Sequence, residues 1–581
     1  MKEKTIGQLL QFVRNNKNMR MKDVCEGICD STTYSRYETG EYIPDMFTAG
    51  FLLERMEVDS SGIQYVSSYE EAEALVIRKT LQNALHSGEL LDNESLIDYY
   101  KKNYSRKKAH RQYITFYEGK LQELKGLTED AERLYLEGYL ITHKDKKNLT
   151  QPYFSKQELG LLISYLRITK SKEYWQELYQ YLLGKDKYNV LKMVFTADVA
   201  IGFCESEAAD GEEPVMINAS LQYLKEINAL IGTWQLLKYK QNNPSKTGRL
   251  TQDEKNLYDA ITELELQIPN DGKEFRRWTK GDLLHSLRKE LGLTQEELSD
   301  GICDVTVLAR YESGKLDPGK EKLELLLNRM HRSGVNYKFS YNSGTMYNIE
   351  NYMEMEKSVE RHDVKDGINK FYSNAVLMNS FMDDMEKTQM NEEVAIVRKY
   401  SEGNIDQKTY IAELEKLIKR SIPEFKDGKF SYNRIMNETE ISILNIIGVA
   451  YRNNDETAKS MALYDNVEKY VYEHNMPFNK AIVKALNNYS DFLMLDGDYD
   501  KSSELSKKVM TSILEYDSQN MLFITVYHMA CSLYAQNAWN SRQTIRCLEL
   551  SHALAVYFNE SNVAIDVIEK YLDIEFHIKL K

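Results

Sequence analysis

The chain has 581 residues, of which 42% are hydrophobic and 28% are charged, and its formal net charge is −14. This length is too great for one hydrophobic core, so several domains are expected. No run of about 18 apolar residues is present, which excludes a membrane-spanning helix, and the acidity of the chain argues against loose, sequence-independent binding of nucleic acid.

The first segment begins without the apolar core of a signal peptide, and the six cysteines of the chain are too sparse for a disulfide framework. We therefore expect a cytoplasmic protein with reduced thiols. Only eight prolines interrupt the chain, and its long segments place apolar residues at helical spacing without the alternation typical of strands. The sequence therefore predicts an all-α fold.

One stretch of the first segment is repeated far downstream. "GICDSTTYSRYETG", residues 27–40, returns as "GICDVTVLARYESG" at residues 301–314. The same offset of 274 positions aligns Gly7 with Gly281, Arg14 with Arg288 and Arg55 with Arg329. Because ungapped agreement over about fifty residues is hard to obtain by chance, we infer a duplicated domain. The offset is close to half the chain, which indicates a tandem fusion of two similar proteins.

Each copy has capping residues and glycines at the spacing expected for a bundle of short helices. In the second copy, Thr294 is placed to cap a short helix, with Glu297 completing a capping box. Asp304, like Asp30 in the first copy, lies where its carboxylate can cap the next helix. A helix, a glycine-containing turn and a second helix together predict a helix-turn-helix, whose second helix fits the major groove of DNA.

The segment "LTQEELSDGICDVTVLARYESGKLDP", residues 293–318, resembles the Xre type of helix-turn-helix. The "GIC" before the third helix is similar to the RNPP group of peptide-responsive quorum-sensing regulators. The resemblance implies a five-helix DNA-binding domain followed by tetratricopeptide-like helical repeats. It also implies a double-stranded DNA operator and a signalling peptide or small ligand as partners.

The third helix of each copy offers candidate DNA contacts. Tyr34 and Leu308 fall at its buried position, which leaves four outward positions in each copy: Ser31, Thr32, Ser35 and Arg36, and Val305, Thr306, Ala309 and Arg310. Hydroxyls and arginines can bond base edges or phosphates, whereas Val and Ala can contact thymine methyl groups. Gln295 matches a position that touches DNA in the resembling family, but the first copy has Met21 there.

Other residues of the motif have a structural interpretation. Tyr37, Glu38, Tyr311 and Glu312 are expected to pack and cap the bundle rather than to read bases. Cys25 and Cys29 are four positions apart, but the second copy keeps only Cys303, so we expect no metal site. The net charge is −1 over residues 1–58 and +1 over residues 275–332, so neither domain forms a strongly basic patch.

The segment after the second copy reads as three successive helix pairs, starting with "LNIIGVAYRNNDETAKSMALYDNVEKY" at residues 444–470, which predicts a helical-repeat array. In the resembling family, asparagines on the inner helices hold a peptide backbone, and Asn445, Asn487 and Asn488 are the candidates here. A hydrogen bond on the helix surface or between repeats explains them equally well. The array after the first copy is more degenerate: Glu158 aligns with Glu440, but Ile163 aligns with Asn445.

We expect four domains: a helix-turn-helix at residues 1–60, a degenerate helical-repeat array at 61–268, a second helix-turn-helix at 275–333 and a tetratricopeptide-like array at 345–581. The turn-rich residues 266–277 are the expected junction. No phosphate loop, metalloprotease spacing or nucleophile elbow is found, so we expect neither an enzyme nor a cofactor.

Two functions are compatible with these patterns. The favoured hypothesis is a transcription regulator whose two fused DNA-binding units act as an intrachain pseudo-dimer, controlled by a peptide or small ligand. Identical chains could also pair as a homodimer. The alternative is a protein-interaction scaffold whose helix-turn-helix domains no longer bind DNA, which their near-neutral charge favours.

Overall fold

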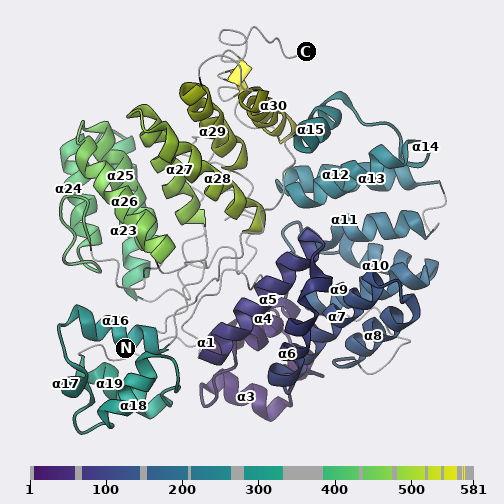
Figure 1. Cartoon of the computed structure of the whole chain (residues 1–581), viewed down its shortest axis with the longest axis horizontal. Coiled ribbons are helices and arrows are strands. Elements are labelled where there is room, and N and C mark those ends of the chain that lie inside the picture. Colours follow the sequence, from purple (N-terminus) through teal and green to yellow (C-terminus); the bar gives the residue numbers. More distant parts are fainter. Residues whose placement is uncertain are drawn as a thin grey trace.

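A computed structural model gives the fold of the chain (Figure 1). It describes residues 6–58, 60, 69–143, 153–206, 211–263, 280–330, 384–430, 436, 438–473, 480–516, 521–537, 542–558, 565–566 and 568–569. These residues are helical apart from turns and one isolated bridge between Lys426 and Lys429. The predicted all-α fold is confirmed for this part of the chain. None of its helices has the length and hydrophobicity to cross a membrane. The expected junction at residues 266–277 lies within 264–279, outside the described residues.

The first and second four-helix units correspond to the repeated sequence. The first unit consists of α1 (Ile6–Asn16), α2 (Met21–Cys25), α3 (Ser31–Thr39) and α4 (Met46–Arg55). The second unit consists of α16 (Lys280–Glu290), α17 (Gln295–Ser299), α18 (Val305–Glu312) and α19 (Lys320–Arg329). Each has its own hydrophobic core, in which Tyr34 and Leu308 are fully buried as expected.

The resemblance implies five helices in each DNA-binding domain, but residues 6–58 and 280–330 contain four each. The next described helix after the first unit is α5 (Tyr69–Ser87). Its buried Ala74, Ile77 and Leu81 belong to the core formed with α6 and α7. This helix also contacts α4 of the first unit, because Glu71 accepts a 2.7 Å bond from the Met46 N–H and the Arg78 guanidinium lies 4.4 Å from the centre of the Phe47 ring. It therefore joins the first unit to its array.

Glycines allow close helix packing in both four-helix units. A Cβ atom on Gly7 in α1 would overlap the carbonyl oxygen of Tyr37 in α3, and one on Gly281 in α16 would overlap that of Tyr311 in α18. The same helix pairs are joined by ion pairs with matching geometry, which are described below. These constraints place α3 and α18 in the same way against the first helix of their unit.

The first array follows as a series of antiparallel neighbours, in which α7 packs on α8, α8 on α9, and α11 on α12 and α13. Its elements are α5, η1 (Leu90–Asn93), α6 (Glu94–Tyr104), α7 (Lys108–Leu124), α8 (Thr128–Leu140), α9 (Lys156–Thr169), α10 (Lys172–Leu183), α11 (Val190–Glu205), α12 (Glu213–Glu226), α13 (Leu230–Asn242), α14 (Pro244–Thr247) and α15 (Gln252–Glu263). Large rings fill the space above glycines, as Trp175 does above Gly202.

The second array has the three expected helix pairs. Its elements are α23 (Asp384–Ser401), α24 (Gln407–Ile418), α25 (Glu438–Asn453), α26 (Thr457–Glu473), α27 (Lys480–Leu495), α28 (Tyr499–Tyr516), α29 (Leu522–Asn537) and α30 (Arg542–Tyr557). Gly448 in α25 faces the Tyr464 ring in α26, so that a Cβ there would lie 2.6 Å from the ring. Tyr451 and Tyr464 are fully buried. The assignment of these pairs to tetratricopeptide repeats stays a prediction.

The two arrays meet at α15 and α30, the last long helix of each that the structure describes. Figure 1 shows α15 beside α30 at the top of the view, and the two helices pack together. One continuous core contains Leu257 and Ile261 of α15 and Leu554 and Tyr557 of α30. Lys225 of α12 also lies over the Tyr557 ring, 5.1 Å from its centre. The halves therefore share a hydrophobic interface.

Candidate nucleic-acid interface

Side-chain caps fix the beginning of both candidate recognition helices. Asp30 accepts bonds of 2.8 Å from the backbone N–H and the hydroxyl of Thr33 at the start of α3. Asp304 accepts from the N–H and the hydroxyl of Thr306 at 2.8 and 2.6 Å at the start of α18. These bonds hold the pKa of both carboxyls below its ordinary value. The predicted capping box between Thr294 and Glu297 is also present.

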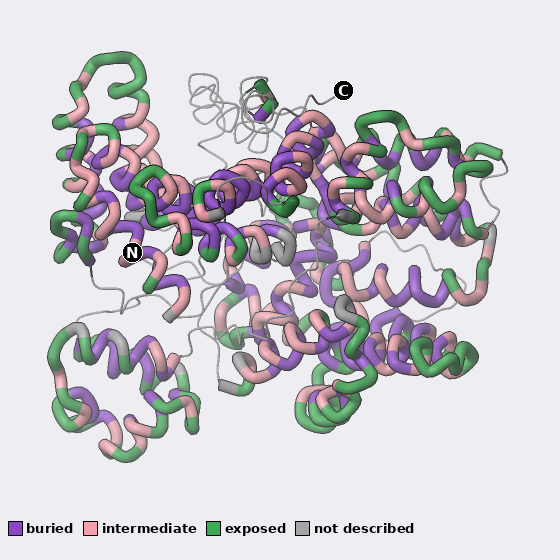
Figure 2. Tube along the Cα trace, turned by 45° about the horizontal axis from the view of Figure 1, so that its top comes forward, coloured by how far each residue is buried: buried purple, intermediate pink, exposed green. Residues whose placement is uncertain are grey.

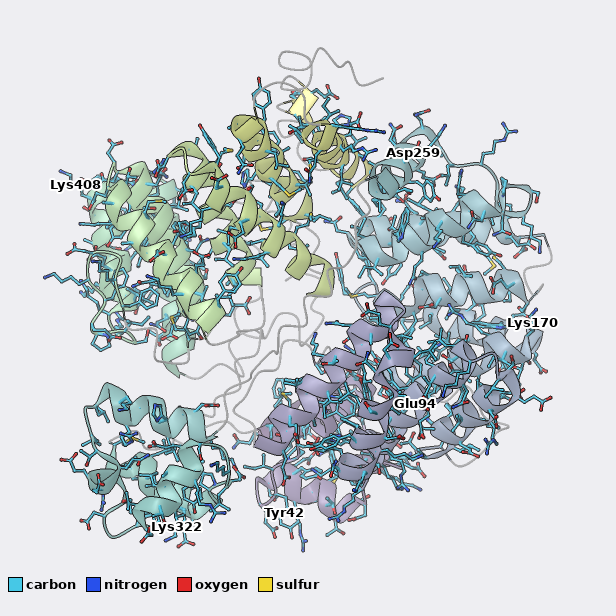
Figure 3. All side chains as sticks on the ribbon, in the orientation of Figure 1. Tyr42, Glu94, Lys170, Asp259, Lys322 and Lys408 are labelled. Carbon is cyan, nitrogen blue, oxygen red and sulfur yellow. The ribbon has the colours of Figure 1, made fainter. Side chains whose placement is uncertain are left out.

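The predicted contact residues of α3 reach the surface, but the arginine is engaged. Ser31 and Thr32 are exposed, and Ser35 and Arg36 are partly exposed. Arg36 donates a 3.2 Å bond from Nη1 to the Tyr42 hydroxyl, and its guanidinium lies 5.1 Å from the centre of that ring. Figure 3 labels Tyr42 at the lower end of the first unit. Glu41 lies 3.6 Å from Arg36 Nε, so DNA would have to compete with these neighbours.

The equivalent helix of the second unit has a freer arginine. Thr306 and Arg310 are exposed, and Val305 and Ala309 are partly exposed; Figure 2 shows this unit with exposed residues around a buried interior. In the part of the chain that the structure describes, no carboxylate lies within ion-pair distance of the Arg310 guanidinium. The outward surface of α18 is therefore less occupied by intramolecular contacts than that of α3.

Gln295 is held by the ion pair at the centre of the second unit. Its amide nitrogen donates a 2.8 Å bond to Glu312, which also accepts from Arg288 Nε at 2.6 Å and lies 3.1 Å from His285. Burial raises the pKa of Glu312, but the bonds from Arg288, Gln295 and His285 outweigh this effect and lower it. At the equivalent position of the first unit, Arg14 pairs with Glu38, with 2.6 Å from Nε to Oε1. The expected packing role of Glu38 and Glu312 is confirmed.

The three candidate asparagines of the second array lie on α25 and α27 but differ in environment. Asn445 is partly exposed; its Oδ1 accepts from the Tyr464 hydroxyl at 3.0 Å and from Asn488 Nδ2 at 2.9 Å. Asn487 is 1% exposed, and its Oδ1 accepts a 2.8 Å bond from Thr525 in α29. Asn445 and Asn488 therefore form one polar pair between successive helix pairs, whereas Asn487 is buried between α27 and α29.

The cysteines of the first unit lie in its core and turn. Cys25 is buried and Cys29 is partly buried. A hydrogen bond from Cys29 lowers the pKa of the Cys25 thiol to about 7. Among the described residues, no group of three or more His, Cys, Asp or Glu side chains is arranged to hold a metal ion.

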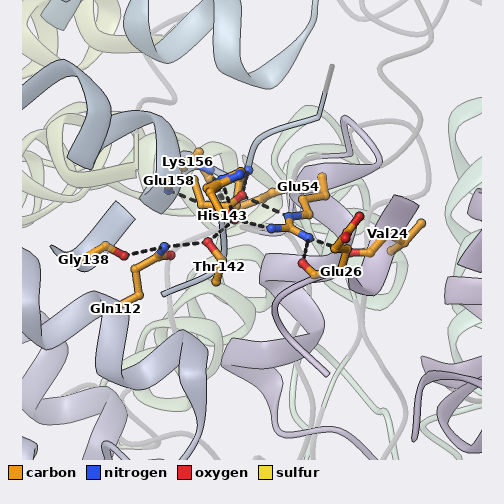
Figure 4. A network of polar contacts seen from close by, with 11 residues as sticks. Val24, Glu26, Glu54, Gln112, Gly138, Thr142, His143, Lys156 and Glu158 are labelled. Carbon is orange, nitrogen blue, oxygen red and sulfur yellow. Dashed lines mark hydrogen bonds and ion pairs between the residues drawn. The ribbon is translucent and has the colours of Figure 1, made fainter. Parts of the chain in front are cut away.

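A buried network that the sequence did not lead us to expect attaches the first unit to its array (Figure 4). Arg55 at the end of α4 donates through Nε to Glu158 at 3.0 Å and also through Nη2, while its Nη1 donates to the carbonyl oxygens of Val24 and Glu26. The Thr142 hydroxyl donates a 2.6 Å bond to the same carboxylate. Burial raises the pKa of Glu158, but the charge of Arg55 and the neighbouring His143 hold it well below its ordinary value.

A second network supports the same attachment. Asp45, which caps α4, lies 3.2 Å from His110 Nε2 and accepts a 2.7 Å bond from Lys107. The Tyr100 hydroxyl lies 2.6 Å from the other ring nitrogen of His110. Burial raises the pKa of Asp45, but His110 and Lys107 hold it well below its ordinary value. The sequence repeats Arg55 as Arg329 and Glu158 as Glu440, which is the one signal from which the first network could have been found.

Comparison with known proteins places one family within the chain. Residues 284–333 match the helix-turn-helix family HTH_3, so this segment is a helix-turn-helix. Two crystal structures of Bacillus thuringiensis PlcR are similar to part of the chain at 18% identity. The complex with the peptide PapR7 and DNA covers 51% of this chain and 97% of that one, with a TM-score of 0.30. The apo form covers 50% and 97%, with a TM-score of 0.28.

Proposed function

We propose that the protein is a non-enzymatic transcription regulator that binds a specific double-stranded DNA site with both four-helix units of one chain. The observation that carries the proposal is the second unit. Its sequence matches the helix-turn-helix family, and α18 presents Val305, Thr306, Ala309 and Arg310 outward behind a fixed Asp304 cap. An α-helix held in this way can enter the major groove with its first turns against base edges.

The packing of the two arrays supports an intrachain pseudo-dimer. In a two-fold dimer, equivalent surfaces contact each other. Here α15 and α30, each the last described long helix of its array, pack together and share one core. The same four-helix unit opens both halves, so the interface joins equivalent ends of the two halves within one molecule. Under this proposal a fused chain needs no second copy to present two reading helices.

Control by a peptide or small ligand is the second part of the proposal. Asn445 and Asn488 lie on the first helices of successive pairs, are partly exposed and are bonded to each other. An amide both donates and accepts, which suits binding to a peptide backbone. Ile163 in the first array aligns with Asn445 and is buried at 3% exposure, so we assign the ligand site to the second array alone.

Selection of binding sites from random duplexes, followed by footprinting, tests the pseudo-dimer. We expect an imperfect inverted repeat, because the outward residues of α3 and α18 differ, with half-site centres about 34–36 Å apart or a multiple of this. The Val305 and Ala309 surface should favour thymine methyl groups. A perfectly palindromic site would instead show that two chains pair through equivalent units.

The scaffold alternative rests on the first unit. Arg36 is engaged by Tyr42 and Glu41, and the unit is attached to its array through Arg55 and Glu158. A gel shift with genomic fragments separates the two functions: a scaffold gives no sequence-dependent shift at any salt concentration. Mass spectrometry of peptides that copurify with the chain tests the ligand part independently.

A further inference from the structure

We propose that the second four-helix unit docks onto the second array through Arg329, with Glu440 in the first turn of α25 as its partner. The interface is the counterpart of the one that Arg55 and Glu158 form in the first half, and it is not formed in this structure. The occupant of the docking site is thus a segment of the same chain. The proposal concerns attachment within the molecule and does not depend on DNA binding.

The docking face of the second unit is uncovered. Arg55 is 3% exposed, whereas its counterpart Arg329 is exposed. Phe51, one turn before Arg55, is 3% exposed, whereas its counterpart Leu325 is 43% exposed. In the first unit α4 packs on α7 and α9. Among the described residues, those in the hydrophobic core of the second unit all lie between Leu283 and Met330.

Two glycines at equivalent turns also mark a place where the first unit contacts its array and the second unit, among the described residues, does not. Gly27 has a φ of 80°, and a Cβ there would overlap the backbone of Thr142 in the first array. Gly301 has a φ of 67°, and a Cβ there would meet no atom within 4 Å. The turn between the second and third helices is therefore pressed against the array in the first half and open in the second.

Arg329 is already oriented for the interaction. Its Nη1 donates to the carbonyl oxygens of Leu298 and Asp300, the counterparts of the carbonyls that Arg55 binds in α2 and its turn. In Arg55 this leaves Nε and Nη2 to form a two-point bond with a carboxylate. Among the described residues, no carboxylate lies within ion-pair distance of Arg329. The Nε and Nη2 groups of Arg329 are thus oriented to form a two-point bond with a carboxylate.

The second array contains counterparts of Glu158 and of a buried glutamine network near it. Glu440 is the third residue of α25, as Glu158 is the third residue of α9, and the two are 4% and 0% exposed. Beside Glu158, the Gln112 amide donates to the Gly138 carbonyl at 3.0 Å and to the Thr142 hydroxyl at 2.8 Å.

Gln389 of the second array makes hydrogen bonds equivalent to those of Gln112. The Gln389 amide donates to the Leu417 carbonyl at 3.5 Å and to the Ser421 hydroxyl at 2.8 Å. Both glutamines are buried, at 0% and 1% exposure. The Ser421 hydroxyl therefore accepts from Gln389 as the Thr142 hydroxyl accepts from Gln112, and it also lies 3.4 Å from the Ile418 carbonyl. Since Glu440 is already buried, docking exchanges its present neighbours for Arg329.

The second attachment is expected to be weaker than the first. Asp45, the centre of the other network of the first unit, has Gly319 as its counterpart at the start of α19. The second unit therefore retains the arginine and lacks the capping aspartate that binds His110 and Lys107 in the first half. Losing one of two buried networks makes the second docking reversible, so that the position of α18 relative to α25 can change.

Photocrosslinking in the full-length chain tests the docking. Leu325 is replaced by p-benzoylphenylalanine, and the matched control carries it at Leu316, which is 38% exposed in the turn after α18. We expect crosslinks within one chain from position 325 to residues 417–444. The position 316 control should give none. Crosslinks only between chains, only to residues 331–383, or no more than in the control would overturn the proposal.

Arginine and glutamate variants then identify the contact. Arg329→Ala and Glu440→Gln should each reduce the crosslink yield by about tenfold or more, because a buried pair that loses one partner is strongly destabilised. Arg329→Lys should also lose most of it, since an ammonium cannot form the two-point bond. Arg310→Ala, which removes the same charge from another surface, should leave the yield unchanged. Circular dichroism establishes that each variant is folded. Equal yields in Arg329→Ala and Arg310→Ala would contradict the assignment.

Discussion

Gln295 and Glu312 are joined by a 2.8 Å hydrogen bond from the amide nitrogen to the carboxylate. Because Glu312 is anchored by Arg288, the bond holds the Gln295 side chain at the start of α17. In the first unit the same position is Met21, which offers no hydrogen bond to Glu38. The two units therefore present different polar groups beside their candidate recognition helices.

The first prediction follows from this difference. Arg310→Ala combined with Gln295→Ala should weaken specific DNA binding more than Arg36→Ala, because Arg36 is already engaged by Tyr42 and Glu41. Each lost base contact is worth about 1–3 kcal/mol. Fluorescence anisotropy with the selected duplex at fixed salt measures the loss. Equal losses in the two variants would show that both units contribute alike.

The second prediction separates the asparagines of the second array. Asn487→Ala should lower the stability of the second array by about 1–3 kcal/mol, because it removes the acceptor of the buried Thr525 bond. Asn445→Ala should cost less, since Asn445 is partly exposed and water can replace its bonds, whereas Asn487 is 1% exposed. Hydrogen exchange of α26 to α29 measures both.

Peptide recovery completes this comparison. If Asn445 holds a peptide, Asn445→Ala should lose copurifying peptide while keeping native exchange rates. Recovery of the same amount of peptide from Asn445→Ala and Asn488→Ala would remove this pair from the ligand site. Loss of peptide in Asn487→Ala is uninformative about contact, because the same change alters the packing of α27 on α29.

The third prediction concerns helix packing in both units. Gly7→Ala and Gly281→Ala should each destabilise their unit by about 1–3 kcal/mol or more, because the added Cβ overlaps the carbonyl oxygen of Tyr37 or Tyr311. Gly160→Ala is the control: it lies inside α9, and its Cβ would be 3.9 Å from Phe195, so a gain of about 0.5–1 kcal/mol is expected. Local hydrogen exchange in α1 and α16 reports the effect, and native rates there in both variants would contradict it.

The fourth prediction is the pH dependence of the first attachment. The pKa of Glu158 lies well below its ordinary value of 4.5 in the folded protein. Its contribution is therefore present above pH 4.5 and is lost as the pH falls from there towards the lowered pKa. Glu158→Gln should weaken the attachment by about 3–5 kcal/mol at pH 7, and the difference from the unmodified chain should shrink below pH 4.5.

Hydrogen exchange of α4 at several pH values measures this difference. The control is Glu118→Gln, because Glu118 pairs with Lys101, whose side chain is 55% exposed, and such pairs contribute about 0–1 kcal/mol. A difference between Glu158→Gln and the unmodified chain that stays constant down to pH 3 would show that the carboxylate charge is not what holds the first unit.

Local features of the fold were predictable from the sequence. Asp30, Asp304 and the Thr294 capping box act within three residues of their position, so their residue types suffice to place them. The burial of Tyr34 and Leu308 follows from helical periodicity. Helix ends and core positions of this kind depend on neighbouring residues only, which is why the repeated segment could be read so closely.

Long-range features were not predictable. Arg55 and Glu158 are 103 positions apart, and nothing in their local sequence says that they meet. The bond of Gln295 to Glu312 depends on how α17 packs on α18. Asn487 occupies the same helix as Asn488, but its burial depends on the rotation of α27 against α29. Each of these contacts depends on how separate helices pack together, which cannot be predicted from composition and residue spacing.

The contact between α15 and α30 has a consequence for how this molecule can change over time. In a homodimer, one substitution at the interface changes both subunits at once. The surface must therefore remain complementary to an identical copy of itself. In the proposed pseudo-dimer Ile261 and Leu554 lie on different helices of one chain. A substitution at either position changes one side of the interface alone, and a second substitution on the opposite helix can compensate for it. The two halves are thereby free to diverge into unlike members of a pair, each retained for a separate task.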